Sequence, residues 1–164
     1  MPRSSHRAPG RVLPILWAML CGPGVHSAPI KVHQLEGGLS IRMPEAASIS
    51  EESSAGDAVV YRLRNLTGKR FLLIYLGNRP SFLRAPRGAS ASRTSISGLA
   101  AAGIRWSDSQ GRQFGLVRIR LPAQRWPAFV QFSYGPLSRD EADIAETVIG
   151  SVRTGPQDGG EQLE

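Results

Sequence analysis

The chain has 164 residues, one Cys, three His and a formal net charge of +7 at pH 7. That length allows a single domain. A lone Cys excludes an internal disulfide, so the fold has to rest on its hydrophobic core, as a domain of this size can.

Residues 1–27 are expected to be a secretory signal peptide. Three arginines precede the apolar run 12–21 (VLPILWAMLC), and small residues follow it, which is the layout of such a peptide. The run is too short for a transmembrane helix, which needs about 20 apolar residues. We expect cleavage after Ser27 and a secreted or periplasmic protein. Lipid attachment at Cys21 is the alternative.

Loss of this segment changes the available chemistry. Cys21 and two of the three His leave with it, so His33 is the one imidazole that remains, and 17 basic residues face 13 acidic ones. A zinc site of Cys and His ligands is then excluded within one chain. We therefore expect no metal, and the absence of a nucleotide or cofactor motif predicts no cofactor.

Alternation of apolar and polar residues predicts strands over 39–43 and 58–64. The intervening residues 44–57 are rich in Ser and Glu and are expected to form a loop. Residues 65–69 (NLTGK) are a turn, and 71–77 (FLLIYLG) is apolar on both faces, which is typical of a central, covered strand. The residues expected to face the core are Leu39, Ile41, Met43, Val59, Tyr61 and Leu63.

Further along the chain, residues 83–95 (LRAPRGASASRTS) lack apolar periodicity and are expected to form a mobile loop. A second hairpin is predicted from 101–107 and 112–121, which flank the turn sequence DSQG. The proline-bracketed segment 122–127 is a connection, and 128–134 (AFVQFSY) is another strand.

One helix is predicted after Ser138, because Ser138 and Glu141 form an S-x-x-E capping box. The apolar residues of this helix share one face, and Gly155-Pro156 ends it. The expected core residues of the helix are Ala142, Ala145, Val148, Ile149 and Val152.

These elements predict one α+β domain over residues 28–153. Its fold is an antiparallel meander of about five or six strands with a C-terminal helix packed on one face. Residues 154–164 (TGPQDGGEQLE) have the composition of a disordered tail.

The close of the chain, LSRDEADIAETVIGSVR, resembles that of small exported PsbP/Mog1/DcrB-like α/β sandwiches. In that family the last helix carries an apolar seam and ends in a Ser followed by a basic residue, here Ser151 and Arg153. The resemblance implies an accessory or binding protein, and it implies no shared set of catalytic residues.

Arginines are the strongest functional signal in the sequence. If the apolar side chains of each strand face inward, the arginines of the strands face outward. No Asp or Glu lies in the predicted strands, and like charges on a sheet repel one another. The face is then either solvated or a site for an anion such as a glycan, to which Arg and aromatic groups are suited. The arginines concerned are Arg42, Arg62, Arg64, Arg105, Arg118 and Arg120.

A second candidate site is the rim of the sheet after Gly77. Asn78 and Arg79 turn the chain there, Phe82 would fold back over it, and the predicted mobile loop follows, which is a common place for a ligand site. Trp126 is a candidate anchor for a partner in an envelope assembly, since aromatic residues are common interface anchors.

The leading functional hypothesis is an exported, non-catalytic binding or accessory protein. Its ligand sites are Arg62, Arg64, Arg118 and Arg120 on the sheet, with the rim residues beside them. An anionic glycan or an envelope protein is the expected partner, and a nucleic acid is not. The alternative is a small hydrolase that uses a Ser nucleophile with His33, which is the group a Ser-His-Asp centre would need.

Overall fold

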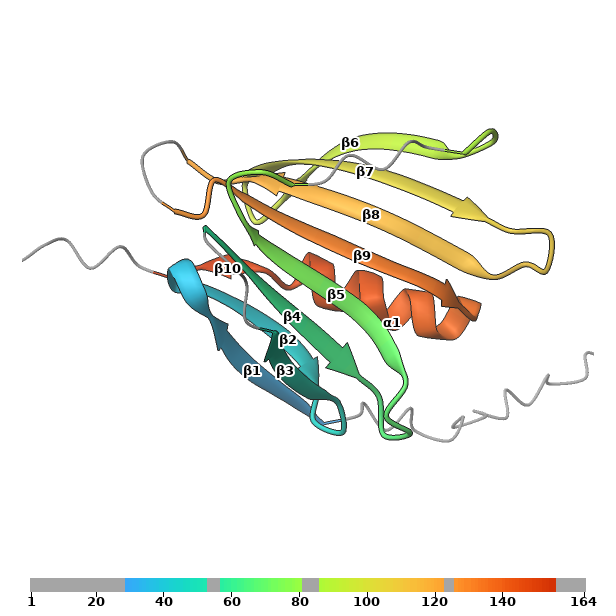
Figure 1. The fold of residues 1–164 in the computed structure, drawn as a ribbon, viewed down its shortest axis with the longest axis horizontal. Coiled ribbons are helices and arrows are strands. Elements are labelled where there is room, and N and C mark those ends of the chain that lie inside the picture. Colours follow the sequence, from blue (N-terminus) through green and yellow to red (C-terminus); the bar gives the residue numbers. More distant parts are fainter. Residues whose placement is uncertain (1–28, 53–56, 81–85, 123–125, 156–164) are drawn as a thin grey trace, which may run out of the picture.

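The computed structural model describes residues 29–52, 57–80, 86–122 and 126–155, which form ten strands, one α-helix and one short 3-10 helix (Figure 1). A three-stranded sheet has the order β1-β2-β10, and a seven-stranded sheet has the order β3-β4-β5-β9-β8-β7-β6. Every pair of neighbouring strands is antiparallel. The small sheet consists of β1 (Ile30–Leu35), β2 (Leu39–Pro44) and β10 (Arg153–Thr154), with the 3-10 helix at Glu36–Gly38.

The large sheet is built mainly from hairpins. Its strands are β3 (Ser48–Glu52), β4 (Ala58–Arg64), β5 (Arg70–Gly77), β6 (Ser90–Ile96), β7 (Leu99–Ser107), β8 (Gln113–Arg120) and β9 (Phe129–Leu137). Strands β3 to β5 are neighbours in chain order, and so are β6 to β9, while β9 joins the two sets because it lies between β5 and β8. The chain then enters α1 (Arg139–Gly150), which lies along one face of this sheet (Figure 1).

The core lies between the large sheet and a layer made by α1 and the small sheet. Tyr61, Ile74, Phe132 and Val117 occupy one row across β4, β5, β9 and β8, and all four are buried. The Tyr61 hydroxyl accepts a hydrogen bond from the backbone N–H of Glu36, which ties the small sheet to this face. Alternate residues of β2 and the apolar stripe of α1 complete the same cluster, as the sequence predicts. These are Leu39, Ile41, Met43, Ala142, Ala145, Val148 and Ile149.

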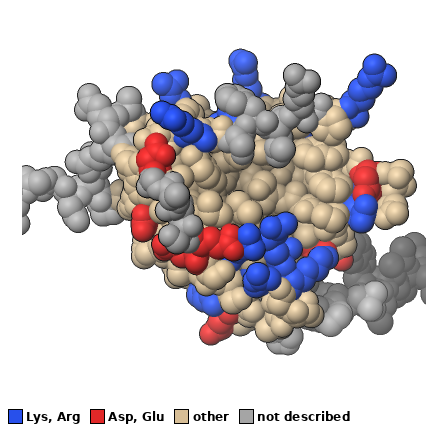
Figure 2. Space-filling view, viewed as in Figure 1, with Lys and Arg blue, Asp and Glu red and all other residues tan. Residues whose placement is uncertain are grey.

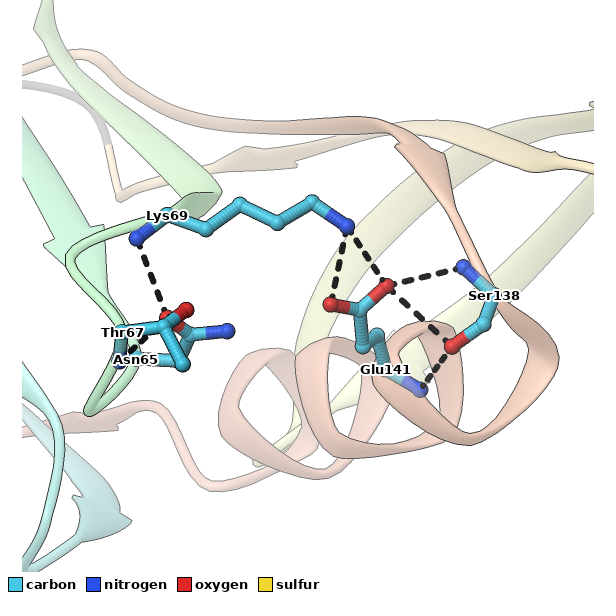
Figure 3. Close-up of polar contacts among 5 residues, drawn as sticks. All are labelled: Asn65, Thr67, Lys69, Ser138 and Glu141. Atoms are coloured by element: carbon cyan, nitrogen blue, oxygen red, sulfur yellow. Dashed lines mark hydrogen bonds and ion pairs between the residues drawn. The ribbon is translucent and has the colours of Figure 1, made fainter.

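The beginning of α1 is fixed by polar contacts among Lys69, Ser138 and Glu141 (Figure 3). Ser138 and Glu141 form the expected capping box, with the Ser138 backbone N–H 2.9 Å from Glu141 Oε2. Lys69, the last residue of the β4–β5 turn, places its Nζ 2.9 and 3.0 Å from the two oxygens of the same carboxylate. The backbone N–H of Ser138 and the ammonium of Lys69 hold the pKa of Glu141 below its usual value.

The middle of α1 is joined to the sheet by a half-buried charge cluster. Arg105 of β7 donates two hydrogen bonds to Glu146, at 2.6 and 2.7 Å, and the Tyr134 hydroxyl of β9 donates a third at 2.7 Å. Burial raises the pKa of Glu146, but the bonds from Arg105 and Tyr134 outweigh it and the pKa lies below its usual value. Burial and the bond to Glu146 raise the pKa of Tyr134.

The position of Arg105 corrects the prediction that it faces away from the core. β7 carries its small residues, Ala101 and Gly103, on the side of α1, and its large residues, Ile104 and Trp106, on the other side. The apolar alternation therefore indicates the wrong face for this strand. Because Ala101 and Gly103 leave room under the helix, Arg105 can reach Glu146.

The strand count differs from the predicted five or six. β3 lies within the predicted loop 44–57, β6 occupies the second half of the predicted loop 83–95 and extends one residue beyond it, and β1 precedes the first predicted strand. The predicted central strand is interior but not central, because β9 is the middle strand of the large sheet. The predicted signal peptide 1–27, Phe82 and tail residues 156–164 lie outside the described residues, whereas Thr154 pairs with Leu39 in β10.

Candidate functional site

The face of the large sheet that points away from α1, called the open face here, is the candidate site. Within the described ranges, no helix or strand lies over it (Figure 1). The strand register shows which side chains lie on the open face, because directly opposed residues in antiparallel strands point to the same side. A set of such opposed residues running across the sheet is called a row. The rows contain Val60, Leu73, Tyr75, Ile104, Leu116, Phe129, Gln131 and Ser133 at the centre of the sheet.

The four arginines predicted as ligand sites, Arg62, Arg64, Arg118 and Arg120, all lie on the open face, whereas Arg42 lies on the small sheet and Arg105 faces α1. Arg62 is in one row with Leu73, Ser133 and Leu116, and Arg118 is in the next row with Gln131 and Tyr75. Arg64 and Arg120 follow by alternation on the same two strands. The predicted strand phase is therefore correct for these four residues.

The four arginines do not form one cluster, because β5 and β9 separate β4 from β8. With strands spaced about 4.8 Å apart, Arg62 and Arg118 are held about 14 Å apart across the sheet. They also lie at different levels along the strands. Arg62 and Arg64 are toward the β4–β5 turn, and Arg118 and Arg120 are toward the other end of the sheet.

Each of the two groups contains a further arginine that was not among those predicted from the sequence. Arg70 lies directly opposite Arg64, and Arg93 of β6 lies in the row of Arg118, with Ala102 between them. Strand alternation would have identified Arg93 if residues 90–96 had shown an apolar pattern. Arg70 was missed because it precedes the apolar run of its strand.

The neighbours of the arginines determine how much positive charge the open face keeps. Arg62 Nε lies 2.6 Å from a carboxylate oxygen of Glu52, and Arg64 donates to the backbone oxygen of Gly68 at 2.9 Å. Arg118 donates to the Gln131 side-chain oxygen at 3.2 Å. Glu52 is the one acidic residue on this face within the described strands. Blue side chains accordingly gather beside β4 and β5, next to a red group, in Figure 2.

An aromatic pair lies on the open face at the same end of the sheet as Arg64. Trp106 and Phe114 face each other across β7 and β8, with ring centroids 5.3 Å apart and nearly parallel planes. The ring of Phe114 lies against Gly135, whose φ is 118° and where a Cβ would stand 2.4 Å from the Phe114 ring. Gly135 is thus required for the position of Phe114.

A cavity of about 220 Å³ separates this aromatic pair from β5. The ladder between β5 and β9 ends at the pair Leu73 and Ser133, although β5 begins at Arg70 and β9 continues to Leu137. The two strands diverge beyond that pair, and the cavity fills the gap. Its walls include Arg70, Leu73, Trp106, Phe114 and Ser133.

The rim residues proposed from the sequence have mainly structural contacts. The Asn78 side chain accepts a hydrogen bond from the backbone N–H of Ala128 at 3.1 Å, and the Trp126 indole donates to the backbone oxygen of Asp57 at 2.7 Å. The backbone N–H of Arg79 donates to the Tyr75 hydroxyl, and its side chain is exposed. These three residues lie at the sheet end near Arg120, away from the cavity.

His33 lies on β1 in the small sheet, opposite Ile41, and is half-buried. Among the described side chains, none makes a hydrogen bond with it, and so no described Ser hydroxyl is hydrogen-bonded to it. In the same part of the chain, no group of three or more His, Cys, Asp or Glu residues is arranged to hold a metal ion. No described helix has both the length and the apolar composition needed to cross a membrane.

Comparison with known proteins assigns no family. No family model and no curated protein matches the chain. Three solved chains match, and one is a protein from Bacteroides thetaiotaomicron with 12% sequence identity and a TM-score of 0.40. The match covers 73% of this chain and 46% of the other, so this chain spans less than half of that protein's length.

Proposed function

We propose that this protein is an exported, non-catalytic binding or accessory domain that recognises an anionic envelope component through the open face. The observation that carries the proposal is the excess of positive charge on that face. Six arginines share it with one acidic residue of the described strands. The six are Arg62, Arg64, Arg70, Arg93, Arg118 and Arg120.

The arrangement suits an extended ligand better than a single small anion. Two groups of arginines flank an uncharged strip that contains Leu73, Tyr75 and Phe129, and the strip is partly accessible. A chain with regularly spaced negative groups would reach both groups while its uncharged parts lie on the strip. The guanidinium group favours carboxylate, sulfate and phosphate, because it donates two parallel hydrogen bonds to them.

An anionic glycan of the envelope fits this chemistry and the expected export, and a nucleic acid does not fit the expected compartment. An envelope protein with acidic side chains is the second partner class. The likeness to PsbP/Mog1/DcrB-like accessory proteins stays a prediction that points the same way. The hydrolase alternative has no observation in its favour, since His33 lies on the small sheet and not on the open face.

The direct test is retention of the protein on an anionic polysaccharide column. The double variant Arg118→Gln with Arg120→Gln should elute at lower salt than the wild type, because fewer counterions are released when it binds. The matched control is Arg42→Gln with Arg139→Gln, which removes the same charge from exposed positions on β2 and α1. Equal elution of the two double variants would contradict the proposal, because net charge would then account for retention.

The export part of the proposal has its own test, namely N-terminal sequencing of the protein recovered from the envelope or the medium. We expect the sequence to begin at Ala28. Recovery with residues 12–21 still attached would contradict the proposed cleavage, and a modified Cys21 at the terminus would instead establish the lipid-anchored alternative.

A further inference from the structure

The cavity at the divergence of β5 and β9 has the features of a site for one ring of the ligand. It is lined by an aromatic pair on one side and by Arg70 and Leu73 on the other, with Ser133 at its edge. Its volume of about 220 Å³ is below the about 300–1,000 Å³ of typical small-molecule pockets. A single sugar unit of a longer chain is therefore a better fit than a whole cofactor.

The aromatic wall is held in place before any ligand binds. Trp106 and Phe114 support each other as a stacked pair, and Phe114 rests on the bare backbone of Gly135. Both rings are half-buried, so part of each remains accessible. A flat, apolar surface of this kind stacks on the C–H face of a sugar ring through dispersion and burial of apolar area.

The charged wall of the cavity is Arg70, and Arg64 stands next to it on β4, outside the lining of the cavity. Arg64 and Arg70 are direct cross-strand partners, and like charges in that position destabilise a sheet. Among the described residues, neither side chain forms an ion pair. The Arg64 side chain donates a hydrogen bond to the backbone oxygen of Gly68. An anionic group bound between the two guanidinium groups would remove this repulsion.

We infer that this cavity binds a sugar ring that carries one carboxylate or sulfate group. The ring lies against Trp106 and Phe114, and its anionic group is held by Arg70 together with Arg64. This inference deepens the proposed function, on which it rests, because it names the ligand class and the position on the open face at which one unit is selected.

The strands on either side explain why the site lies here and not elsewhere on the face. Where β5 and β9 are paired, from Leu73 to Gly77, side chains fill the surface between them. Beyond Leu73 the pairing of the two strands ends and the cavity begins, so a ring that enters the cavity meets Ser133 as well as the aromatic pair. The remaining arginines of the open face are left to hold neighbouring units of the same chain; these are Arg62, Arg93, Arg118 and Arg120.

The test is titration of the protein with three trisaccharides, made of galacturonic acid, of its neutral methyl ester, and of a sulfated neutral sugar. We expect one or both anionic trisaccharides to bind at least about tenfold more tightly than the ester. Trp106→Ala and Arg70→Gln should each weaken that binding about tenfold, a loss within the range for a stacked or charge-assisted contact. Arg139→Gln, on the helix side, should bind as the wild type does.

Melting curves of the two site variants show whether each is folded. If Trp106→Ala does not fold, Arg70→Gln still tests the inference, because Arg70 is exposed. Equal binding of the ester, or unchanged binding by Arg70→Gln, would overturn the inference. If Arg118→Gln with Arg120→Gln still loses retention on the anionic column, the proposed function stands without this site. If the wild type binds neither the column nor any trisaccharide, both are wrong.

Discussion

Replacement of Ile149 by Ala tests whether the sheet-facing stripe of α1 holds the domain together. Ile149 is 1% exposed and belongs to the core cluster. The change deletes three carbon atoms, which corresponds to about 2.4 kcal/mol of lost transfer free energy at about 0.8 kcal/mol per methylene. The cavity left behind adds to this, so the expected loss of unfolding free energy is about 2–5 kcal/mol.

Thermal unfolding followed by circular dichroism measures the effect. A loss of that size lowers the melting temperature by about 8–20 °C in a domain of this length. The matched control is Ile144→Ala, the same substitution on the same helix at a side chain that is 44% exposed. It should shift the stability by less than about 1 kcal/mol. Equal shifts for the two variants would show that the assigned buried face of α1 is wrong.

Three further predictions concern the contacts around α1 and the aromatic pair. Glu146→Gln should cost about 1.5–3 kcal/mol in urea unfolding, because the bonds to Arg105 and Tyr134 lose their charge, whereas the exposed control Asp143→Asn should cost much less. Folding lowers the pKa values of Glu141 and Glu146, so their contribution to the free energy of unfolding is complete above about pH 5 and is lost as the pH falls below it. The difference in stability between the wild type and the double variant Glu141→Gln with Glu146→Gln should therefore shrink by about pH 3, and a widening difference would contradict this. Gly135→Ala should destabilise the chain by about 1–3 kcal/mol and displace Phe114, while Gly150→Ala, where a Cβ meets nothing within 4 Å, should not.

The interior of the fold could be predicted from the sequence because burial leaves a pattern in it. Leu39, Ile41 and Met43 alternate on a strand with one buried face, and the residues after Ser138 repeat with the helical period. In both segments one side of the element meets water and the other meets the core, so the hydrophobic pattern and the backbone geometry agree.

Edge strands left no such pattern. β3 and β6 lie at the two edges of the large sheet, and their residues are mostly exposed Ser, Glu, Ala and Arg. Backbone hydrogen bonds to one neighbour hold such strands, and backbone bonds carry no sequence signature. Charged and polar residues there also hinder pairing with other molecules.

The candidate site was predictable only in part for related reasons. Alternation on β4 and β8 placed Arg62 and Arg118 on one face correctly. It could not show that β9 inserts between β5 and β8, because that depends on a pairing distant in sequence. The separation of the arginines into two groups and the cavity beside Trp106 both follow from that insertion.

The central claim is that the open face binds an anionic ligand, and amide chemical-shift mapping tests it most directly. During titration of the isotope-labelled protein with a uronic-acid oligosaccharide, we expect salt-sensitive shifts along β5, β8 and β9. The largest should lie near Arg70, Trp106 and Arg118, and residues of α1 and the small sheet should be little affected. Shifts concentrated on α1 and on β1 and β2, or no saturable shifts at low salt, would contradict the account.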